Sequence, residues 1–467
     1  MPHDHSEFYF VEPMKVTSRL DFEFNHPKYE KIEDAFSKAE YAVHNLADNS
    51  ILKETIVSGK TPERYVYPES GIPFLGGRNI HDGFVDLSNC DFVSEELHES
   101  MLAGSNVQNA DVLVTMAGVN VGRTGVYESD EEANINQAIA RLRPSEKVNP
   151  KFLCYFLNSR IGSMQFRKNR HDVGQPNINT DEIGQLRIIL PPRDIQDKIV
   201  ERIREIEKES LRLSGDAHLE LSNALNAIVH ILGFELPPKI RTDYFYITPD
   251  ELAQSRLDYI ANEPWHKEVI KSIDRHNPLV LDALIEPQIE YGINDYGREF
   301  GRVPFINIEN LTETGNIDLA NVHYLDYEPP QAKALRVNDV LISRSRLVGR
   351  CSFVTEQEAN ATWGSYILRM RLKEDAKVSS EYLVNYVNSP LGQAQIDVLK
   401  GGSVGTNINP NAIRAIKVIV PNKDQHAKVA QTLQSGKSKA RELAEKGKEK
   451  MRNAQALFEK FVSPSLL

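Results

Sequence analysis

Cysteine is scarce in this sequence, and long apolar runs are missing. The three cysteines, Cys90, Cys154 and Cys351, are odd in number and far apart, which argues against a disulfide framework and against a paired-cysteine zinc site. No uninterrupted apolar stretch approaches the roughly 18 residues that a membrane span needs, and the N-terminus has no basic region followed by an apolar core. We therefore expect a cytoplasmic protein without a membrane association.

Positive charge is also in short supply. The chain has 55 Lys and Arg against 66 Asp and Glu, a formal net charge of -11, which argues against a protein that coats nucleic acid by bulk charge. Any DNA binding must therefore be local. The 467 residues exceed one ordinary core, and this length predicts two to four domains.

Motifs of self-contained catalysis are absent from the sequence. An adenine methyltransferase needs a glycine-rich cofactor loop that opens a helix and an Asn/Asp-Pro-Pro-aromatic segment, but Gly76–Gly77 and Pro191–Pro192 fit neither pattern. No GxxxxGK[ST] phosphate loop occurs. Asp111 and Asp339 stand alone before strand-like segments, where turn or capping roles are commoner than metal binding. We predict no catalytic residue, no metal site and no cofactor in this chain.

An internal repeat organises the chain. The segment SRLDFEFNHPKYEKI (Ser18–Ile32) returns as SRLDYIANEPWHKEVI (Ser255–Ile270), at an offset of 237 residues. Further blocks recur in the same order at offsets of about 227 to 231: Ile72–Leu87 with Val303–Leu319, Ala110–Arg123 with Asn338–Arg350, Phe152–Gly162 with Tyr382–Gly392, Gly174–Asn179 with Gly405–Asn409, and Leu186–Ile199 with Ile416–Val429. Chance does not preserve such an order, so the chain is a tandem duplication.

Each half is predicted to hold one globular α+β domain followed by a long helix. Segments such as DVLVTM and DVLISR alternate like strands, whereas FLCYFLNS has the pattern of a helix. The expected boundaries are 1–192 for the first domain, 193–232 for a central spacer helix, 233–422 for the second domain and 423–467 for a C-terminal spacer helix.

The two spacer helices carry apolar seams. The seam of the C-terminal helix alternates by four and three residues, as in a coiled coil. The predicted interface residues are Ile199, Ile203, Ile206, Leu221, Leu225, Ile228, Ala440, Ala444, Met451, Ala454 and Phe458. Each helix alone could equally lie on its own domain, but one helix at the end of each repeat favours mutual packing.

Packing the two helices antiparallel would place the two domains in an approximate twofold arrangement. A helix of about 40 residues spans roughly 60 Å, and DNA half-sites on one face of a duplex lie about 34 to 36 Å apart or at multiples of that distance. The helices could therefore fix the gap between two short sequences.

These blocks resemble the specificity subunit of type I restriction-modification systems, across essentially the whole chain. The resemblance rests on the paired segments IPFLGGRNIHDG and VPFINIENLTETG, on VGR, on NSxxG and on the proline-then-glutamine entry to each helix. It implies a non-catalytic chain with two target-recognition domains, 1–192 and 233–422, that reads a bipartite double-stranded DNA target. It also implies two methyltransferase subunits that hold S-adenosylmethionine, and a restriction subunit that can join them.

Base reading needs exposed Asn, Gln, Arg and Lys, with Ser and Thr available for phosphates. In the first half the candidates are Lys60, Arg64, Arg78, Asn79, Arg123, Arg167, Lys168, Arg170, Gln175 and Asn177. In the second half they are Arg298, Arg302, Asn310, Arg344, Arg346, Arg350, Lys400, Ser403, Thr406 and Asn407. Solvated strand ends and ordinary turns are the alternative interpretation. The repeats diverge at Ser58–Ser70 and Gln288–Arg302, where different half-site sequences would be set.

Three other readings of the sequence remain open. The chain could be a specificity-like DNA reader of another phage-defence or modification assembly, which only its partner would reveal. It could be a protein scaffold without DNA preference. A self-contained enzyme is the third reading, and the missing motifs count against it.

Overall fold

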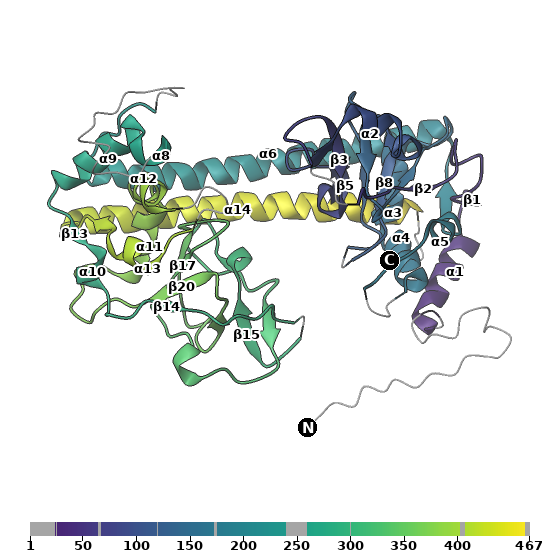
Figure 1. The fold of residues 1–467 in the computed structure, drawn as a ribbon. Helices are drawn as coiled ribbons and strands as arrows, with labels where there is room; N and C mark the ends of the chain where they lie inside the picture. Colours follow the sequence, from purple (N-terminus) through teal and green to yellow (C-terminus); the bar gives the residue numbers. More distant parts are fainter. Residues whose placement is uncertain are drawn as a thin grey trace. The chain divides into compact units, whose positions relative to one another are not determined.

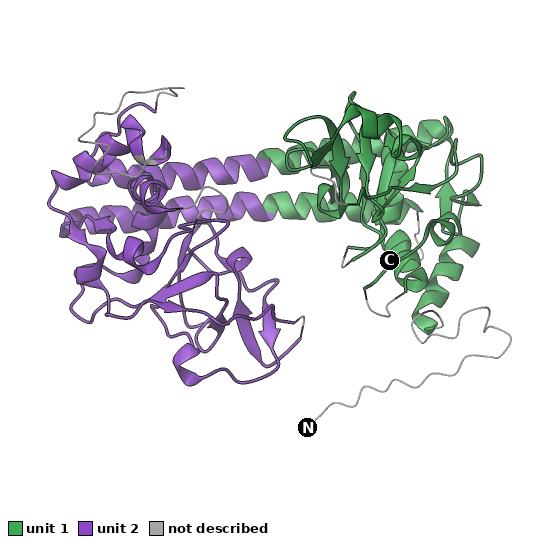
Figure 2. Ribbon diagram, viewed as in Figure 1, with its two compact units in different colours: residues 1–212, 446–467 green, residues 213–445 purple. Residues whose placement is uncertain are grey.

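The computed structural model describes residues 24, 26–63, 67–118, 120–171, 175–239, 259–298, 300–401 and 407–462 (Figure 1). The chain divides into two compact units (Figure 2). Unit 1 comprises residues 1–212 and 446–467, and unit 2 comprises residues 213–445. Each unit therefore combines a globular part with the ends of two long helices.

Unit 1 contains two mixed sheets and a strand pair. The strand order is β6-β3-β10-β7 in the first sheet and β2-β11-β8-β9-β5-β4 in the second, with β1 and β12 paired separately. The strands are β1 (Ala42–Asn45), β2 (Val57–Ser58), β3 (Ile72–Leu75), β4 (Ile80–His81), β5 (Gly83–Val85), β6 (Asp91–Val93), β7 (Asn106–Val107), β8 (Val112–Thr115), β9 (Thr124–Val126), β10 (Ala133–Ile135), β11 (Ile139–Leu142) and β12 (Arg187–Leu190). Its helices are α1 (Glu30–Ser37), α2 (Glu95–Glu99), α3 (Pro150–Asn158), α4 (Arg160–Asn169), α5 (Thr180–Gly184) and the first part of α6 (Arg193–Ile231).

Unit 2 repeats this plan, with fewer strands among its described residues. The orders are β14-β20-β17-β18 and β16-β15-β19, with β13 and β21 paired separately. The strands are β13 (Leu279–Val280), β14 (Glu290–Tyr291), β15 (Val303–Ile306), β16 (His323–Leu325), β17 (Val340–Ser343), β18 (Cys351–Phe353), β19 (Thr362–Trp363), β20 (Ile367–Met370) and β21 (Lys417–Val418). Its helices are α8 (Tyr259–Asn262), α9 (Pro264–Asp274), α10 (Leu281–Leu284), α11 (Ser380–Asn388), α12 (Pro390–Leu399), α13 (Pro410–Arg414) and part of α14 (Lys423–Val462).

The duplicated sequence blocks make the same contacts in both units. Asn158 joins the end of α3 to β9, because it accepts from Thr124 N (3.1 Å) and donates to Thr124 O (2.7 Å). Asn388 does the same with the backbone of Cys351, at 3.0 and 2.8 Å. The asparagine of the NSxxG block therefore holds a helix end against a central strand through two hydrogen bonds.

The glycine of that block permits a tight turn between two helices. A Cβ on Gly162 would lie 2.3 Å from Leu157 O, and one on Gly392 would lie 2.3 Å from Val387 O. Backbone oxygens cannot yield at that distance, so any side chain at either position would force the helices apart.

The ends of the two long helices pack antiparallel within each unit. In unit 1, Ser210 Oγ donates to Gly447 O at 2.9 Å, and Lys450 pairs with Glu209 at 2.8 Å. In unit 2, Gln425 Nε2 donates to Ile231 O at 3.1 Å. Figure 1 shows the same pairing of α6 with α14. The predicted α+β fold with two long packed helices is confirmed, whereas the twofold arrangement stays a prediction.

The predicted seam residues differ in burial. In unit 1, Ile203, Ala454 and Phe458 are buried, while Ile199 and Ile206 pack against the same core from partly exposed positions. In unit 2, Leu221, Ile228 and Ala440 are buried, and Leu225 is partly buried. Ala444 is half-buried. Met451 departs from the expected pattern because its side chain is 44% exposed.

Two further expectations concern thiols and membranes. Burial raises the pKa of the Cys154 thiol to about 12 and raises that of Cys351 further, and all three cysteines are free. Both buried thiols are therefore packing residues.

Of the helices in the described ranges, none is both long enough and apolar enough to cross a bilayer.

Candidate nucleic-acid interface

One edge of the fold is built by the same backbone bonds in both units. In unit 2, Arg344 N donates to Tyr366 O (2.9 Å), and Ile408 N donates to Arg344 O (3.0 Å). In unit 1, Met116 N donates to Ala138 O (2.7 Å), and Ile178 N donates to Met116 O (2.9 Å). The residue after β17 and the residue after β8 are therefore structural equivalents.

A short strand and a loop complete the edge in each unit. Ser58 pairs with Ala140 in unit 1, and Tyr291 pairs with Leu368 in unit 2. The glycine that follows each strand passes over a turn of the sheet: a Cβ on Gly59 would lie 1.8 Å from Ile135 O, and one on Gly292 would lie 2.2 Å from Trp363 O. Here the loops that differ between the repeats meet the backbone pattern that the two units share.

The loop after α4 or α12 returns to the edge through a backbone bridge. His171 and Asn177 exchange both backbone bonds, at 2.7 and 3.0 Å, and Gly401 and Asn407 do so at 2.7 and 2.8 Å. We call these groups the unit-1 edge (58–61, 116–118, 136–138 and 175–178) and the unit-2 edge (291–293, 344, 364–366, 407 and 408).

The edges carry different side chains on this common backbone. The unit-1 edge presents exposed Lys60, Gln175 and Asn177. The unit-2 edge presents Tyr291 and Tyr366, which are 42% and 61% exposed, and places the guanidinium of Arg344 5.0 Å from the centre of the Tyr291 ring. Large exposed aromatics beside an arginine are typical of surfaces that bind a ligand.

Several predicted DNA-contact residues are engaged in ion pairs. Arg78 pairs with Asp91 at 2.8 Å, and Arg123 lies 3.8 Å from Asp82. In unit 2, Arg346 pairs with Glu309 and Arg350 with Glu313, both at 3.0 Å, and Arg298 pairs with Asp326. These cations must give up a carboxylate before they can bind a phosphate or a base.

Asn79 and Asn310 have a local structural role. Both are buried, and each closes a turn: Asn79 accepts from Gly76 N and donates to Asp86 O, while Asn310 accepts from Asn307 N and donates to Asp318 O. Their amides are engaged within the fold, and their contact with DNA stays a prediction. The interface proposed below leaves them out.

The remaining predicted residues are scattered. Arg167 and Lys168 lie at the end of α4, with the ammonium of Lys168 5.2 Å from the Phe24 ring centre, and Arg170 follows as the helix cap. Arg302 is exposed just before β15. Arg64, Ser403 and Thr406 lie outside the described residues.

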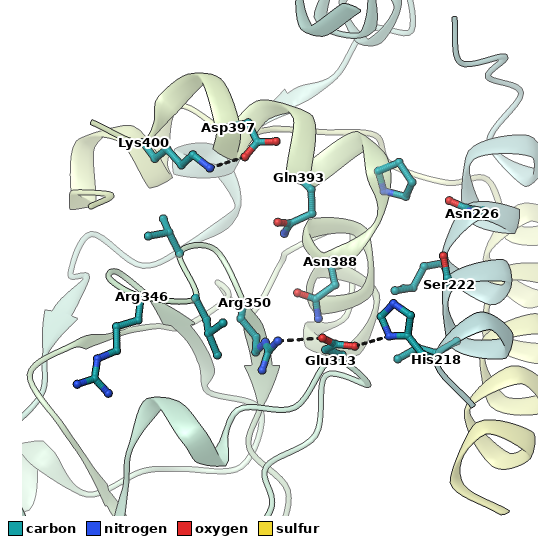
Figure 3. Close-up of a pocket in the computed structure, with 15 residues that line it drawn as sticks. His218, Ser222, Asn226, Glu313, Arg346, Arg350, Asn388, Gln393, Asp397 and Lys400 are labelled. Carbon is teal, nitrogen blue, oxygen red and sulfur yellow. Dashed lines mark hydrogen bonds and ion pairs between the residues drawn. The ribbon is translucent and has the colours of Figure 1, made fainter. Parts of the chain in front are cut away.

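A pocket of about 540 Å³ in unit 2 lies between α6, the loop before β18 and the α11–α12 junction. Glu313 sits between Arg350 and His218, which lies on α6, and binds each at 3.0 Å (Figure 3). Lys400 pairs with Asp397 at 2.7 Å on the far side of the pocket. The pocket therefore holds Arg350 and Lys400 in neutral pairs, and Glu313 links α6 to the sheet.

The carboxylates that precede the central strands are also structural. Asp111 accepts from Gln108 N and binds Arg143 at 2.8 Å, and Asp339 accepts from Arg336 N and binds Arg371. Hydrogen bonding to the carboxylates raises the pKa of both arginines. In the described parts of the chain, no three His, Cys, Asp or Glu side chains form a group that could hold a metal ion.

Sequence reasoning missed the two tyrosines of the unit-2 edge and the link between His218 and Glu313. Tyr291 could have been found from its place in a segment where the repeats diverge, beside a glycine. His218 carries no sequence signal, because its partner is 95 residues away in the chain.

Comparison with known proteins bears on this duplicated edge. Residues 103–221 match the model of the type I restriction modification DNA specificity domain, which covers β7 to β12 and much of α6. This stretch of the chain is similar to the DNA specificity domain of type I restriction-modification systems.

Similar proteins differ in sequence identity to this chain and in how much of it they match. This chain is 30% identical over 139 residues to the EcoBI type I restriction enzyme specificity subunit of Escherichia coli. The aligned stretch covers 30% of this chain and 29% of that protein. The chain is 22% identical over 441 residues to a type I specificity subunit named MjaX of Methanocaldococcus jannaschii, which covers 92% and 96% of the two chains. A solved type I S subunit from M. genitalium aligns with 92% of this chain and 98% of its own, with 11% identity and a TM-score of 0.39.

Proposed function

We propose that this chain reads a two-part DNA target, with one part contacted by the unit-1 edge and the other by the unit-2 edge. The proposal rests on one observation. The same backbone hydrogen bonds form the edge in both units, but the two edges carry different side chains. Two equal frames suit two short segments of one duplex, and unequal side chains suit two different sequences. The target would then be bipartite and asymmetric.

In this proposal the recognition domains are 1–192 and 233–422, joined by spacer helices 193–232 and 423–467 in an approximate twofold arrangement. A helix of 39 residues is about 58 Å long, so the pair could set the gap between the two parts. The exposed faces of these helices would dock two methyltransferase subunits, which would supply S-adenosylmethionine and methylate adenine. A restriction subunit could join that complex.

Methylation mapping tests the proposal. The chain, assembled with its methyltransferase subunits, is used to methylate genomic DNA from a strain without adenine methylation, and modified adenines are located. We expect one motif of two short segments separated by a fixed gap. Methylation without a motif, or no sequence preference in selection from random duplexes, would favour the protein-scaffold alternative.

A further inference from the structure

We propose that Arg344 reads a guanine in the DNA segment contacted by unit 2, and that Tyr291 positions it. This inference rests on the proposed function and narrows it to one side chain and one base. Arg344 lies close in the sequence to Arg346 and Arg350, but its environment differs from theirs.

The first argument is charge pairing. Arg346 and Arg350 each bind a glutamate at 3.0 Å. Arg344 has no acidic partner among the residues that the structure describes, although it is half-buried. A base can therefore engage it without breaking an existing ion pair.

The second argument is preorganisation. The guanidinium lies 5.0 Å from the centre of the Tyr291 ring, and the Arg344 backbone is fixed on both sides, by Tyr366 O and Ile408 N. Its Nε is buried without a hydrogen-bond partner, which leaves the terminal nitrogens as the groups in contact with solvent. A stacked arginine has already lost much of its conformational freedom on folding, so less is lost on binding.

The third argument comes from the duplication. At the equivalent positions unit 1 has Met116 in place of Arg344, Ser58 in place of Tyr291 and Ala138 in place of Tyr366. The backbone bonds are the same in both units, so the fold does not require an arginine or the two tyrosines. These three side chains are specific to what unit 2 binds.

The choice of guanine follows from the geometry of the Arg344 guanidinium. A phosphate would accept any exposed cation, whereas a planar guanidinium held by an aromatic ring presents parallel N–H donors in a fixed direction. In the major groove, guanine offers two adjacent acceptors, N7 and O6, that match such a fork. A good bidentate pair of this kind discriminates roughly 10- to 100-fold against other bases.

The test uses the complete chain assembled with its methyltransferase subunits and the methylation mapping described above. Wild type is compared with Arg344→Ala, Arg344→Lys and the matched control Arg346→Ala. Arg344→Ala and Arg344→Lys should each lose the requirement for guanine at one position of one segment by roughly 10- to 100-fold, with the other segment unchanged. Arg346→Ala should keep the motif and weaken binding at every sequence alike.

Arg344→Lys keeps the charge but lacks the fork, so it decides the question if Arg344→Ala does not assemble. Tyr291→Ala should weaken the same guanine preference, and Tyr291→Phe, which keeps the ring, should restore it. An unchanged motif in Arg344→Lys, or loss of the same guanine in Arg346→Ala, overturns the role of Arg344 but leaves the proposed function intact. A wild-type complex that methylates without any motif overturns the proposed function as well.

Discussion

At the scale of single residues, polar side chains in this protein divide into those that hold the frame and those that are available to a ligand. Asn158, Asn388, Asn79 and Asn310 bind backbone groups and complete turns or helix ends. Lys60, Gln175 and Asn177 stand exposed on the unit-1 edge. Residue type alone did not separate these groups, because an asparagine that caps a turn looks like one that reads adenine.

The hydrogen bonds of Asn158 with the Thr124 backbone give the first prediction. Asn158→Asp removes the donor that binds Thr124 O at 2.7 Å, and it points a carboxylate at a carbonyl. We expect the free energy of unfolding to fall by about 1–3 kcal/mol, the cost of an unpaired buried acceptor. Thermal or urea denaturation measures this loss. The same substitution at the exposed Asn360 should leave stability within about 0.5 kcal/mol of wild type.

At the scale of secondary-structure elements, the paired helices are held by close backbone approach as well as by apolar side chains. Gly436 in α14 faces α6 so closely that a Cβ would lie 2.4 Å from the Cβ of Ala224. In α6, a Cβ on Gly215 would lie more than 4 Å from every described atom outside its chain neighbours and the nearby backbone of its own helix. Two glycines in long helices thus have opposite surroundings.

These two glycines give a matched prediction. Gly215→Ala should stabilise the protein by about 0.5–1 kcal/mol, because alanine favours helix over glycine. Gly436→Ala gains the same propensity but forces two helices apart, so we expect a net loss of about 1–2 kcal/mol. Melting temperatures of the two variants measure the difference. Equal stabilisation by both would mean that the helices do not approach closely at Gly436.

A buried carboxylate at the end of α14 gives a pH prediction. Burial raises the pKa of Glu459 above its usual value of 4.5, although hydrogen bonding from Arg160 N opposes the shift. A raised pKa means that the folded state binds a proton more tightly than the unfolded chain. The contribution to stability is therefore complete below about pH 4.5 and is lost as the pH rises through the folded-state pKa.

Glu459→Gln should accordingly stabilise the protein more at pH 8 than at pH 4.5. The control is Glu209→Gln, where the salt bridge with Lys450 lowers the carboxyl pKa. There the contribution is present above the unfolded-state pKa and is lost as the pH falls, so this substitution should cost more at pH 8 than at low pH. Melting curves from pH 8 to about pH 3 compare the two, because the loss at Glu209 falls below its unfolded-state pKa, and parallel profiles would contradict the assignment of Glu459.

Much of the element scale was open to prediction from sequence. The duplication was visible because it repeats letters in order, and the helix seams because α-helical periodicity is local. Contacts between distant segments were not visible. The bridge of Asn177 to His171 and the stacking of Arg344 on Tyr291 depend on how separate loops meet, and Met451 obeys the seam spacing yet remains exposed.

At the scale of the whole molecule, the net charge of -11 confines DNA attraction to local cations. If the assembled complex neutralises about six phosphates, the logarithm of affinity should fall with the logarithm of salt concentration at a slope near -5. Fluorescence anisotropy with a labelled duplex between 50 and 300 mM salt, roughly the range over which such slopes are read, gives this value. A slope near zero would contradict DNA binding by the complex.

The bonds that fix Met116 and Arg344 in their shared position use main-chain atoms alone. The bonds at Arg344 therefore do not depend on which side chain stands there, so a substitution at this position that alters recognition need not break them. Under the proposed function, such a chain can acquire a new target through a handful of substitutions.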